Sequence, residues 1–303
     1  MGRRGGGPAG PDGLAVVDKA AGWTSHDVVA KARGLLGTRK VGHSGTLDPD
    51  ATGVLLLGVG KATRLLRYLG LGPKSYTGVI VLGTATSTLD ASGEVTGTWD
   101  MSSATVDDVR AAAEVLTGDI LQVPPMVSAV HVGGRRLHEL AREGLEVERE
   151  ARPVTVHSFS VGEPVAPGRF PIEVSCSSGT YIRSLAADVG TALGGGAHLS
   201  DLRRTAIGSF TTAAAVPIEA LTPDHLLTPA EALRDLPATV VDATVAADVA
   251  HGKVLPVEVL GVDSATGGPW PVLDSDGVLL AVYEPHRGDT AKPAVVLAAP
   301  VAP

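Results

Sequence analysis

The chain has 303 residues, of which 44% are hydrophobic and 19% are charged, with a formal net charge of -8 at pH 7. That length and apolar content suffice for one large folded domain and a smaller one. The apolar runs fall far short of the roughly 20 residues that span a bilayer, so no membrane helix is expected. Residues 1–13 lack the apolar core of a secretion signal, so we expect them to form a flexible tail and the protein to be cytoplasmic. Cys176 is the only cysteine, which excludes an intramolecular disulfide and cysteine-based zinc or iron–sulfur sites.

The first predicted elements are short and alternate between strand and helix. Residues 14–17 predict a strand, and Thr24 can cap a helix that Gly37 ends. A polar, glycine-rich loop at 42–53 runs into an apolar strand at 54–57. Residues 61–69 predict a helix that faces the core with Ala62, Leu65, Leu66 and Leu69 and turns Lys61, Arg64 and Arg67 outward.

The middle of the chain continues this mixture of strands and helices. Strands are predicted at 76–82, 154–159 and 172–176, and helices at 105–118 and 184–193. Residues 124–152 have a weak pattern and predict an insertion that moves, which carries Arg135, Arg136, Arg142 and Arg149. Because no regular βαβ rhythm is present and no G-x-G-x-x-G motif follows the first strand, the pattern favours an α+β sheet over a doubly wound nucleotide fold.

A second domain is predicted after a boundary near Pro237. From residue 240 onward the pattern is one of short strands, with a hairpin turn at Asp276-Gly277. The predicted organisation is therefore a tail at 1–13, a main domain at 14–237 and a small β-rich, barrel-like accessory domain at 238–303.

Positive charge is concentrated in the first quarter of the chain. Residues 1–75 contain 11 Lys and Arg against 5 Asp and Glu, whereas the rest contains 14 against 28. This excess favours a polyanionic partner, although a solvated surface of mixed charge explains it equally well. The cations nearest in sequence to the 42–53 loop are Lys31, Arg33, Arg39, Lys40, Lys61, Arg64, Arg67 and Lys74.

The 42–53 loop is the strongest candidate for chemistry. Its three glycines can take positive φ, and Pro49 extends the backbone of Asp48, so the loop can hold one carboxylate in a fixed pose. Taken alone, an Asp-Pro turn more often caps its own backbone than acts in catalysis. Asp50, two residues on, would raise the pKa of Asp48 if both faced one pocket, but alternation along the chain predicts that Asp50 points away.

Two tyrosines and one arginine lie in similarly polar, glycine-containing segments. Tyr76 and Tyr181 can stack on an unpaired nucleobase, or simply pack at the edge of a sheet with the hydroxyl satisfied. The planar guanidinium of Arg183 suits a buried carboxylate and would keep Asp48 ionised, unless it belongs to an ordinary structural ion pair.

In order and separation, these motifs resemble the TruB family of tRNA pseudouridine synthases over about residues 14–210. The resemblance rests on five segments. They are Asp18-Lys19 with Gly22, Thr24 and Ser25; residues 42–49 with 51–53; Lys74-Ser75-Tyr76; residues 179–183; and residues 198–204. The resemblance implies a pseudouridine-synthase fold: a mixed, mainly antiparallel sheet flanked by helices, followed by a PUA-like domain. It also implies that uridine 55 in the T loop of tRNA is isomerised to pseudouridine without cofactor or metal. We expect the protein to be a monomer.

The resemblance assigns three catalytic residues. Asp48 is the nucleophile that starts cleavage of the glycosidic bond; attack on the base, attack on the sugar and assistance to a glycal all stay open. Tyr76 stacks on the flipped uracil and takes the C5 proton, and Arg183 pairs with Asp48. Ala20 replaces the proline that the family usually has after its lysine, which puts the rigidity of that turn in doubt.

The remaining predicted site residues bind substrate. Tyr181 and Leu202 shape an apolar pocket wall, His43 lies against the RNA loop, and Lys19 supports the active-site loops and the RNA backbone, or makes a simple ion pair. The 124–152 insertion resembles an RNA clamp. Two other functions remain open: a non-catalytic tRNA-binding or folding protein on the same fold, and a metal-assisted hydrolase that uses His43, Asp48 and Asp50.

Overall fold

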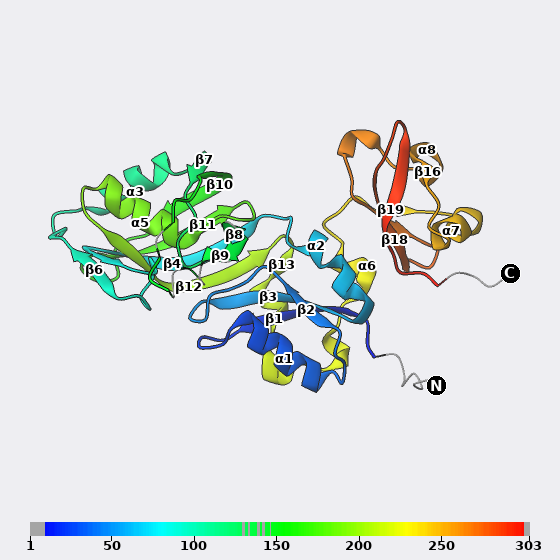
Figure 1. The fold of residues 1–303 in the computed structure, drawn as a ribbon, viewed down its shortest axis with the longest axis horizontal. Coiled ribbons are helices and arrows are strands. Elements are labelled where there is room, and N and C mark those ends of the chain that lie inside the picture. Colours follow the sequence, from blue (N-terminus) through cyan, green and yellow to red (C-terminus); the bar gives the residue numbers. More distant parts are fainter. Residues whose placement is uncertain are drawn as a thin grey trace.

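Two β-sheets organise the chain in the computed structural model, which describes residues 10–128, 131–132, 134–137, 140, 143–145 and 147–299. The larger sheet runs through the left and centre of Figure 1, and the smaller one lies apart at the upper right. Residues 1–9 of the predicted tail lie outside the described residues, and so does Arg142. The end of the predicted tail is structured, because Gly13 belongs to the first strand and Asp12 accepts a hydrogen bond from the Lys61 amide. Among the described helices, none is long and apolar enough to cross a membrane.

The large sheet is mixed and mainly antiparallel. Its strands are β1 (Gly13–Lys19), β2 (Val41–Ser44), β3 (Thr52–Val59), β4 (Lys74–Leu82), β7 (Gly118–Gln122), β10 (Arg152–Val161), β11 (Arg169–Cys176), β12 (Ala197–Ile207), β13 (Phe210–Thr211) and β14 (Val216–Pro217). They are ordered β14-β1-β3-β12-β4-β11-β10-β7, with β2 beside β3 and β13 beside β12. The pairs β1–β14 and β3–β12 are parallel. The predicted α+β class is confirmed.

Helices cover this sheet at the positions predicted from the sequence, but one of the predicted α-helices begins as a 3-10 helix. They are α1 (Ser25–Leu35), α3 (Val106–Val115) and α5 (Ile182–Ala192). Thr24 and Thr105 form capping boxes with Asp27 and Asp108, which explains the sharp starts of α1 and α3. The helix predicted at 61–69 begins as the 3-10 helix η1 (Gly60–Leu65) and continues as α2 (Leu66–Leu69).

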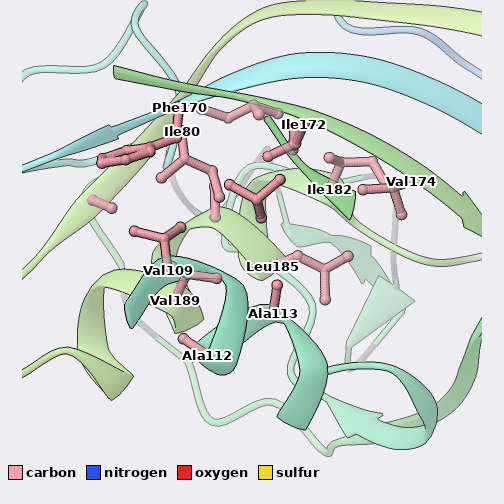
Figure 2. Packing of buried hydrophobic residues seen from close by; sticks show 14 of the residues in the cluster. Ile80, Val109, Ala112, Ala113, Phe170, Ile172, Val174, Ile182, Leu185 and Val189 are labelled. Carbon is pink, nitrogen blue, oxygen red and sulfur yellow. The ribbon is translucent and has the colours of Figure 1, made fainter. Parts of the chain in front are cut away.

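The largest hydrophobic cluster lies between α3, α5 and one end of the sheet (Figure 2). Ile80 on β4 and Phe170 on β11 meet Val109 of α3 and Leu185 of α5 there. Strand β3 is instead buried on both faces, because its alternate side chains enter two different clusters. The strand that follows the Asp48 loop is thus held rigidly from both sides.

The short elements complete the main domain. Two small hairpin sheets pair β5 (Thr84–Thr86) with β6 (Val95–Thr98) and β8 (His131–Val132) with β9 (Arg135–Arg136). Short helical turns connect the large sheet to the second one: η2 (Thr212–Ala214), η3 (Ile218–Ala220), η4 (Pro223–His225) and α6 (Pro229–Ala232).

The second sheet has the order β15-β17-β18-β19-β16, from strands β15 (Thr239–Val240), β16 (Leu255–Pro256), β17 (Trp270–Leu273), β18 (Leu279–Pro285) and β19 (Thr290–Val296). The predicted turn at Asp276-Gly277 joins β17 to β18. The expectation of strands throughout this region is wrong for α7 (Ala243–Ala250) and α8 (Val257–Leu260); η5 (Ser264–Thr266) is a further turn. Asp242 caps α7 by accepting from two backbone amides, and its alanines favour the helix.

The second sheet contacts η1 and α2 through cations that the sequence placed near phosphates. Lys61 and Arg64 donate to the carbonyls of Leu297 and Val296. Arg67 pairs with Glu284 at 2.7 Å, and Glu284 also accepts from the Tyr68 hydroxyl at 2.9 Å. These three cations therefore stabilise a contact between the sheets, which corrects their assignment to a phosphate-facing surface.

Candidate active site

The Asp48 loop is shorter than the sequence suggested. Gly42, His43 and Ser44 belong to β2, and Thr52 and Gly53 begin β3, so the loop itself spans residues 45–51. Ser25 on α1 anchors it, because the Ser25 hydroxyl accepts from the Leu47 amide at 2.9 Å and donates to the Leu47 carbonyl at 3.2 Å. Asp48 follows directly after this anchored and buried leucine.

A glycine is required where β3 leaves the loop. Gly53 has φ 101°, and a Cβ there would lie 2.1 Å from the carbonyl oxygen of Arg204 on the neighbouring strand β12. Any side chain would therefore force β3 and β12 apart at the point where both strands carry site residues.

Lys19 lies beneath the loop and not on the surface. Its side chain is fully buried, and its ammonium donates to the carbonyls of Ala20, Trp23 and Pro49 at 3.0, 2.6 and 2.8 Å. Burial lowers its pKa to about 8, although Asp50 and Asp48 oppose the shift. The predicted role of Lys19 in supporting the active-site loop agrees with this geometry. Its predicted contact with the RNA backbone does not, because the ammonium cannot reach solvent.

Replacing Lys19 with Met is expected to destabilise the fold. The substitution removes the Lys19 donor from the carbonyls of Ala20 and Trp23, whereas the Pro49 carbonyl still accepts from the Gly22 amide at 3.0 Å; an unsatisfied buried polar group costs about 1–3 kcal/mol. Urea denaturation measures the loss, with the exposed Lys40→Met as the matched control. Equal midpoints for the two variants would contradict the anchoring role of Lys19.

Arg183 holds Asp48 with an ion pair and a hydrogen bond. The Arg183 Nε lies 3.0 Å from Asp48 Oδ2, and Nη2 lies 3.3 Å from Oδ1. The guanidinium also donates to the carbonyls of Thr88 at 2.8 Å and Val127 at 2.9 Å, and Asp90 Oδ2 lies 3.6 Å from Nε. Because the Arg183 side chain is 5% exposed and bound on all sides, it fixes the direction of the carboxylate.

The protonation of Asp48 is set by opposing effects. Burial raises the pKa of the Asp48 carboxyl above its usual value, the Arg183 guanidinium lowers it, and Asp90 raises it further. The pair with Arg183 therefore counteracts the cost of burying an ionised carboxylate.

A cavity of about 270 Å³ opens next to Asp48. Tyr76 from β4, Tyr181 from the start of α5 and Leu202 from β12 line it together with Asp48 and Arg183. Its volume is close to the lower end of small-molecule pockets, about 300 Å³. Five of the seven predicted site residues thus meet at one cavity, although they come from distant parts of the sequence.

Two further cations line this cavity: Arg204, which had no role predicted from the sequence, and Lys74, which was predicted as a cation near phosphates. Arg204 is 1% exposed and donates to the carbonyls of Val54, Thr46 and Gly45, at 2.7, 3.4 and 3.0 Å. Lys74 is buried, donates to the Ser178 hydroxyl at 3.0 Å and has its pKa lowered to about 8 by burial. Lys74 is therefore not the surface cation that the charge pattern suggested.

The protonation of Tyr76 depends on the same environment. Burial raises the pKa of the Tyr76 hydroxyl, while the charge and a hydrogen bond of Arg204 act in the opposite direction. The hydroxyl is thus protonated in the resting site and lies against a buried cation that would stabilise it after proton loss.

Asp48 and Arg183 also line a second cavity, of about 290 Å³. Asp90 and Asp50 line it, so the expectation that Asp50 points away from the pocket of Asp48 is wrong. Asp50 nonetheless stands last among the causes that shift the pKa of Asp48. Asp90 was not among the site residues predicted from the sequence. The feature that could have indicated it is the polar turn around it, in which the hydroxyls of Thr88 and Ser92 donate to the Asp90 carboxylate.

His43 does not line either cavity. Its ring makes an edge contact with the ring of His26, with centroids 5.2 Å apart, and burial lowers its pKa. Its buried Nδ1 has no hydrogen-bond partner. Across the part of the chain that the structure describes, no group of three or more His, Cys, Asp or Glu side chains is arranged to hold a metal ion.

The comparison with protein families matches nearly the whole main domain. Residues 33–182 match the N-terminal domain model of the TruB family of pseudouridylate synthases, and residues 183–245 match a C-terminal domain model of tRNA pseudouridylate synthase B. The proteins named tRNA pseudouridine synthase B from Streptomyces coelicolor and Thermobifida fusca are 48% and 47% identical to this chain. The two alignments cover 94% and 95% of this chain and 97% and 99% of those proteins.

Solved structures with the same fold agree with this match. A chain in the crystal structure of a Cbf5-Nop10-Gar1 complex superposes with a TM-score of 0.76 at 26% identity, covering 96% of this chain and 86% of that one. A chain of the archaeal box H/ACA sRNP Nop10-Cbf5 complex gives a TM-score of 0.73 at 24% identity, covering 96% and 88%, and supports the fold alone.

Proposed function

The chain belongs to the TruB family of pseudouridylate synthases, and from this premise we propose that it isomerises uridine 55 in the T loop of tRNA, with Asp48 as the nucleophile. The chain is a pseudouridine synthase, and its curated relatives are named for action on tRNA. The catalytic roles proposed for these residues rest on a single observation: the Asp48–Arg183 pair and Tyr76 line the same cavity.

Each side chain at this cavity has a part in the proposed reaction. Asp48 starts cleavage of the bond between C1′ of the ribose and N1 of the uracil. Tyr76 stacks on the detached base, which rotates so that its C5 forms a new bond to C1′. The Tyr76 hydroxyl gives its proton to N1, and the resulting phenolate takes the proton from C5, so that the product has the same atoms as the substrate and Tyr76 is again protonated.

Arg183 keeps the Asp48 carboxylate ionised and oriented throughout this sequence, because its positive charge opposes the effect of burial and its guanidinium contacts both carboxylate oxygens. Tyr181 and Leu202 form the wall of the pocket. Buried Arg204 stabilises the phenolate that Tyr76 carries after it loses its own proton and before it takes the proton from C5.

The proposed partner is the T stem-loop of tRNA, bound by a monomer. Lys31, Arg33, Arg39 and Lys40 are exposed and remain the cations of the first quarter that can meet phosphates. We extend the proposal to the domains: residues 14–237 catalyse, with the 124–152 insertion as an RNA clamp, and residues 238–303 form a PUA-like accessory domain. Arg135 pairs with Glu143 there, so RNA contact by Arg135 would require exchange of partners.

Release of tritium tests the function directly. Transfer RNA labelled with tritium at C5 of its uridines loses one tritium to water for each uridine that is isomerised. We expect release from wild-type tRNA and none from tRNA with cytidine at position 55. Equal release from both substrates would refute the site assignment, and no release from either would refute the activity. Full release in the presence of a chelator would argue against a metal-assisted reaction.

The pH dependence of the reaction follows from Asp48. The carboxylate has to be ionised to act, and its pKa is raised above the ordinary value of 3.8. Turnover should therefore fall as the pH decreases, with an apparent pKa above 3.8 in kcat/KM. Tritium release between pH 4 and pH 8 measures this limb, and a midpoint at or below the ordinary value would contradict a partly desolvated carboxylate.

A further inference from the structure

Helix α5 begins without a cap from its own sequence, although it carries two residues of the proposed site. Tyr181 occupies the N-cap position and provides no side-chain hydrogen bond to the first turn. Its ring lines the cavity, and Arg183 follows two residues later. Unfixed helix ends fray, so this arrangement needs another source of rigidity.

Gln122, the last residue of β7, supplies that rigidity from a distant part of the chain. Its side chain is 3% exposed. The Gln122 Nε2 donates to the Tyr181 carbonyl at 3.1 Å, and the Gln122 Oε1 accepts from the Tyr181 amide at 2.8 Å. Both ends of the amide are engaged, so the two bonds hold the Tyr181 backbone much as a neighbouring strand would.

The residues after Gln122 extend this attachment along the first turn of α5. The Ser184 hydroxyl donates to the Val123 carbonyl at 3.3 Å. Arg183 donates to the Val127 carbonyl at 2.9 Å with the same Nη2 that contacts Asp48. The segment from Gln122 to Val127 and the start of α5 therefore form one hydrogen-bonded unit around the Asp48–Arg183 pair.

We propose that Gln122 is a positioning residue for pseudouridine formation: its two hydrogen bonds set the Tyr181 ring in the cavity and the Arg183 guanidinium on Asp48. This inference rests on the proposed function. Gln122 does not line the cavity, so it acts through Tyr181 and Arg183. A displacement of about 1 Å at a reacting group can cost about 100-fold in rate, so two lost hydrogen bonds at this point should be visible in turnover.

The variant Gln122→Glu separates positioning from mere packing, because it keeps the size of the side chain. An ionised glutamate accepts from the Tyr181 amide but cannot donate to the Tyr181 carbonyl, whereas a protonated one restores both bonds. Burial raises the pKa of such a carboxyl group. The single-turnover rate relative to wild type should therefore be about 10- to 100-fold low at pH 8 and recover as the pH falls.

Further measurements complete the test. Gln122→Met should lose turnover at every pH, and Leu121→Ala, on the same strand but 73% exposed, should match wild type. Binding of tRNA should stay within about twofold for all three, because no phosphate contact is removed, and thermal melting checks that each is folded.

Rates equal to wild type in folded Gln122→Glu and Gln122→Met, or a loss in Gln122→Glu that does not change with pH, would overturn the proposal. No release by wild type would instead refute the proposed function on which it rests.

Discussion

Asparagine in place of Asp48 is expected to lower tritium release by about 10⁴-fold or more while tRNA still binds. The amide has nearly the shape of the carboxylate, so the cavity and the loop anchored by Ser25 should persist. It lacks the negative charge and the nucleophilic oxygen that the proposed reaction uses first. Single-turnover release and a filter-binding measurement on the same preparation separate the two effects.

Asp50→Asn is the matched control for this experiment. Asp50 lines the neighbouring cavity, two residues from Asp48, and loses the same charge in the same substitution. We expect nearly normal release from it, because Asp50 is the smallest of the causes that shift the pKa of Asp48. Comparable losses in the two variants would show that the reaction depends on the negative charge of the loop in general and not on Asp48 as a nucleophile.

The sequence predicted those parts of the structure that local chemistry determines. Thr24 and Thr105 cap the helices that they were expected to begin, and Asp276-Gly277 makes the expected hairpin turn. The apolar run of β3 and the pattern of residues 76–82 in β4 predicted both strands, because each strand is fixed by burial of its own side chains. The α7 helix was not predicted because its two valines and its threonine favour a strand, and the Asp242 cap was not taken into account.

What the sequence could not predict depends on contacts between distant residues. Lys19 and Arg204 look like surface cations in the sequence, yet each is buried and satisfied by backbone carbonyls that other segments bring to it. Gln122 gave no local signal because its partner Tyr181 is 59 residues away. The charge pattern misled in the same way: Lys61, Arg64 and Arg67 meet the second sheet, a contact that no local pattern encodes.

Methionine in place of Arg183 should produce the second large effect, on stability as well as on turnover. The substitution preserves much of the volume but leaves Asp48 and Asp90 without the cation between them. Breaking a fully buried pair by removing one partner costs about 3–5 kcal/mol, and because the Asp48 side chain is 40% exposed we expect a smaller loss here. Urea denaturation should show this loss, and tritium release should fall by at least about 100-fold at pH 7, as for other groups that stabilise charge at a reaction centre.

The pH dependence of Arg183→Met distinguishes its electrostatic role from simple destabilisation. Arg183 lowers the pKa of Asp48 against the effect of burial, so without it that pKa rises further and the acid limb of kcat/KM moves to higher pH than in wild type. Arg169→Met is the control, since Arg169 pairs with Asp201 at an exposed position. Exposed pairs contribute about 1 kcal/mol at most, so its stability and pH profile should stay close to those of wild type. An unshifted acid limb in folded Arg183→Met would show that the guanidinium orients Asp48 without controlling its ionisation.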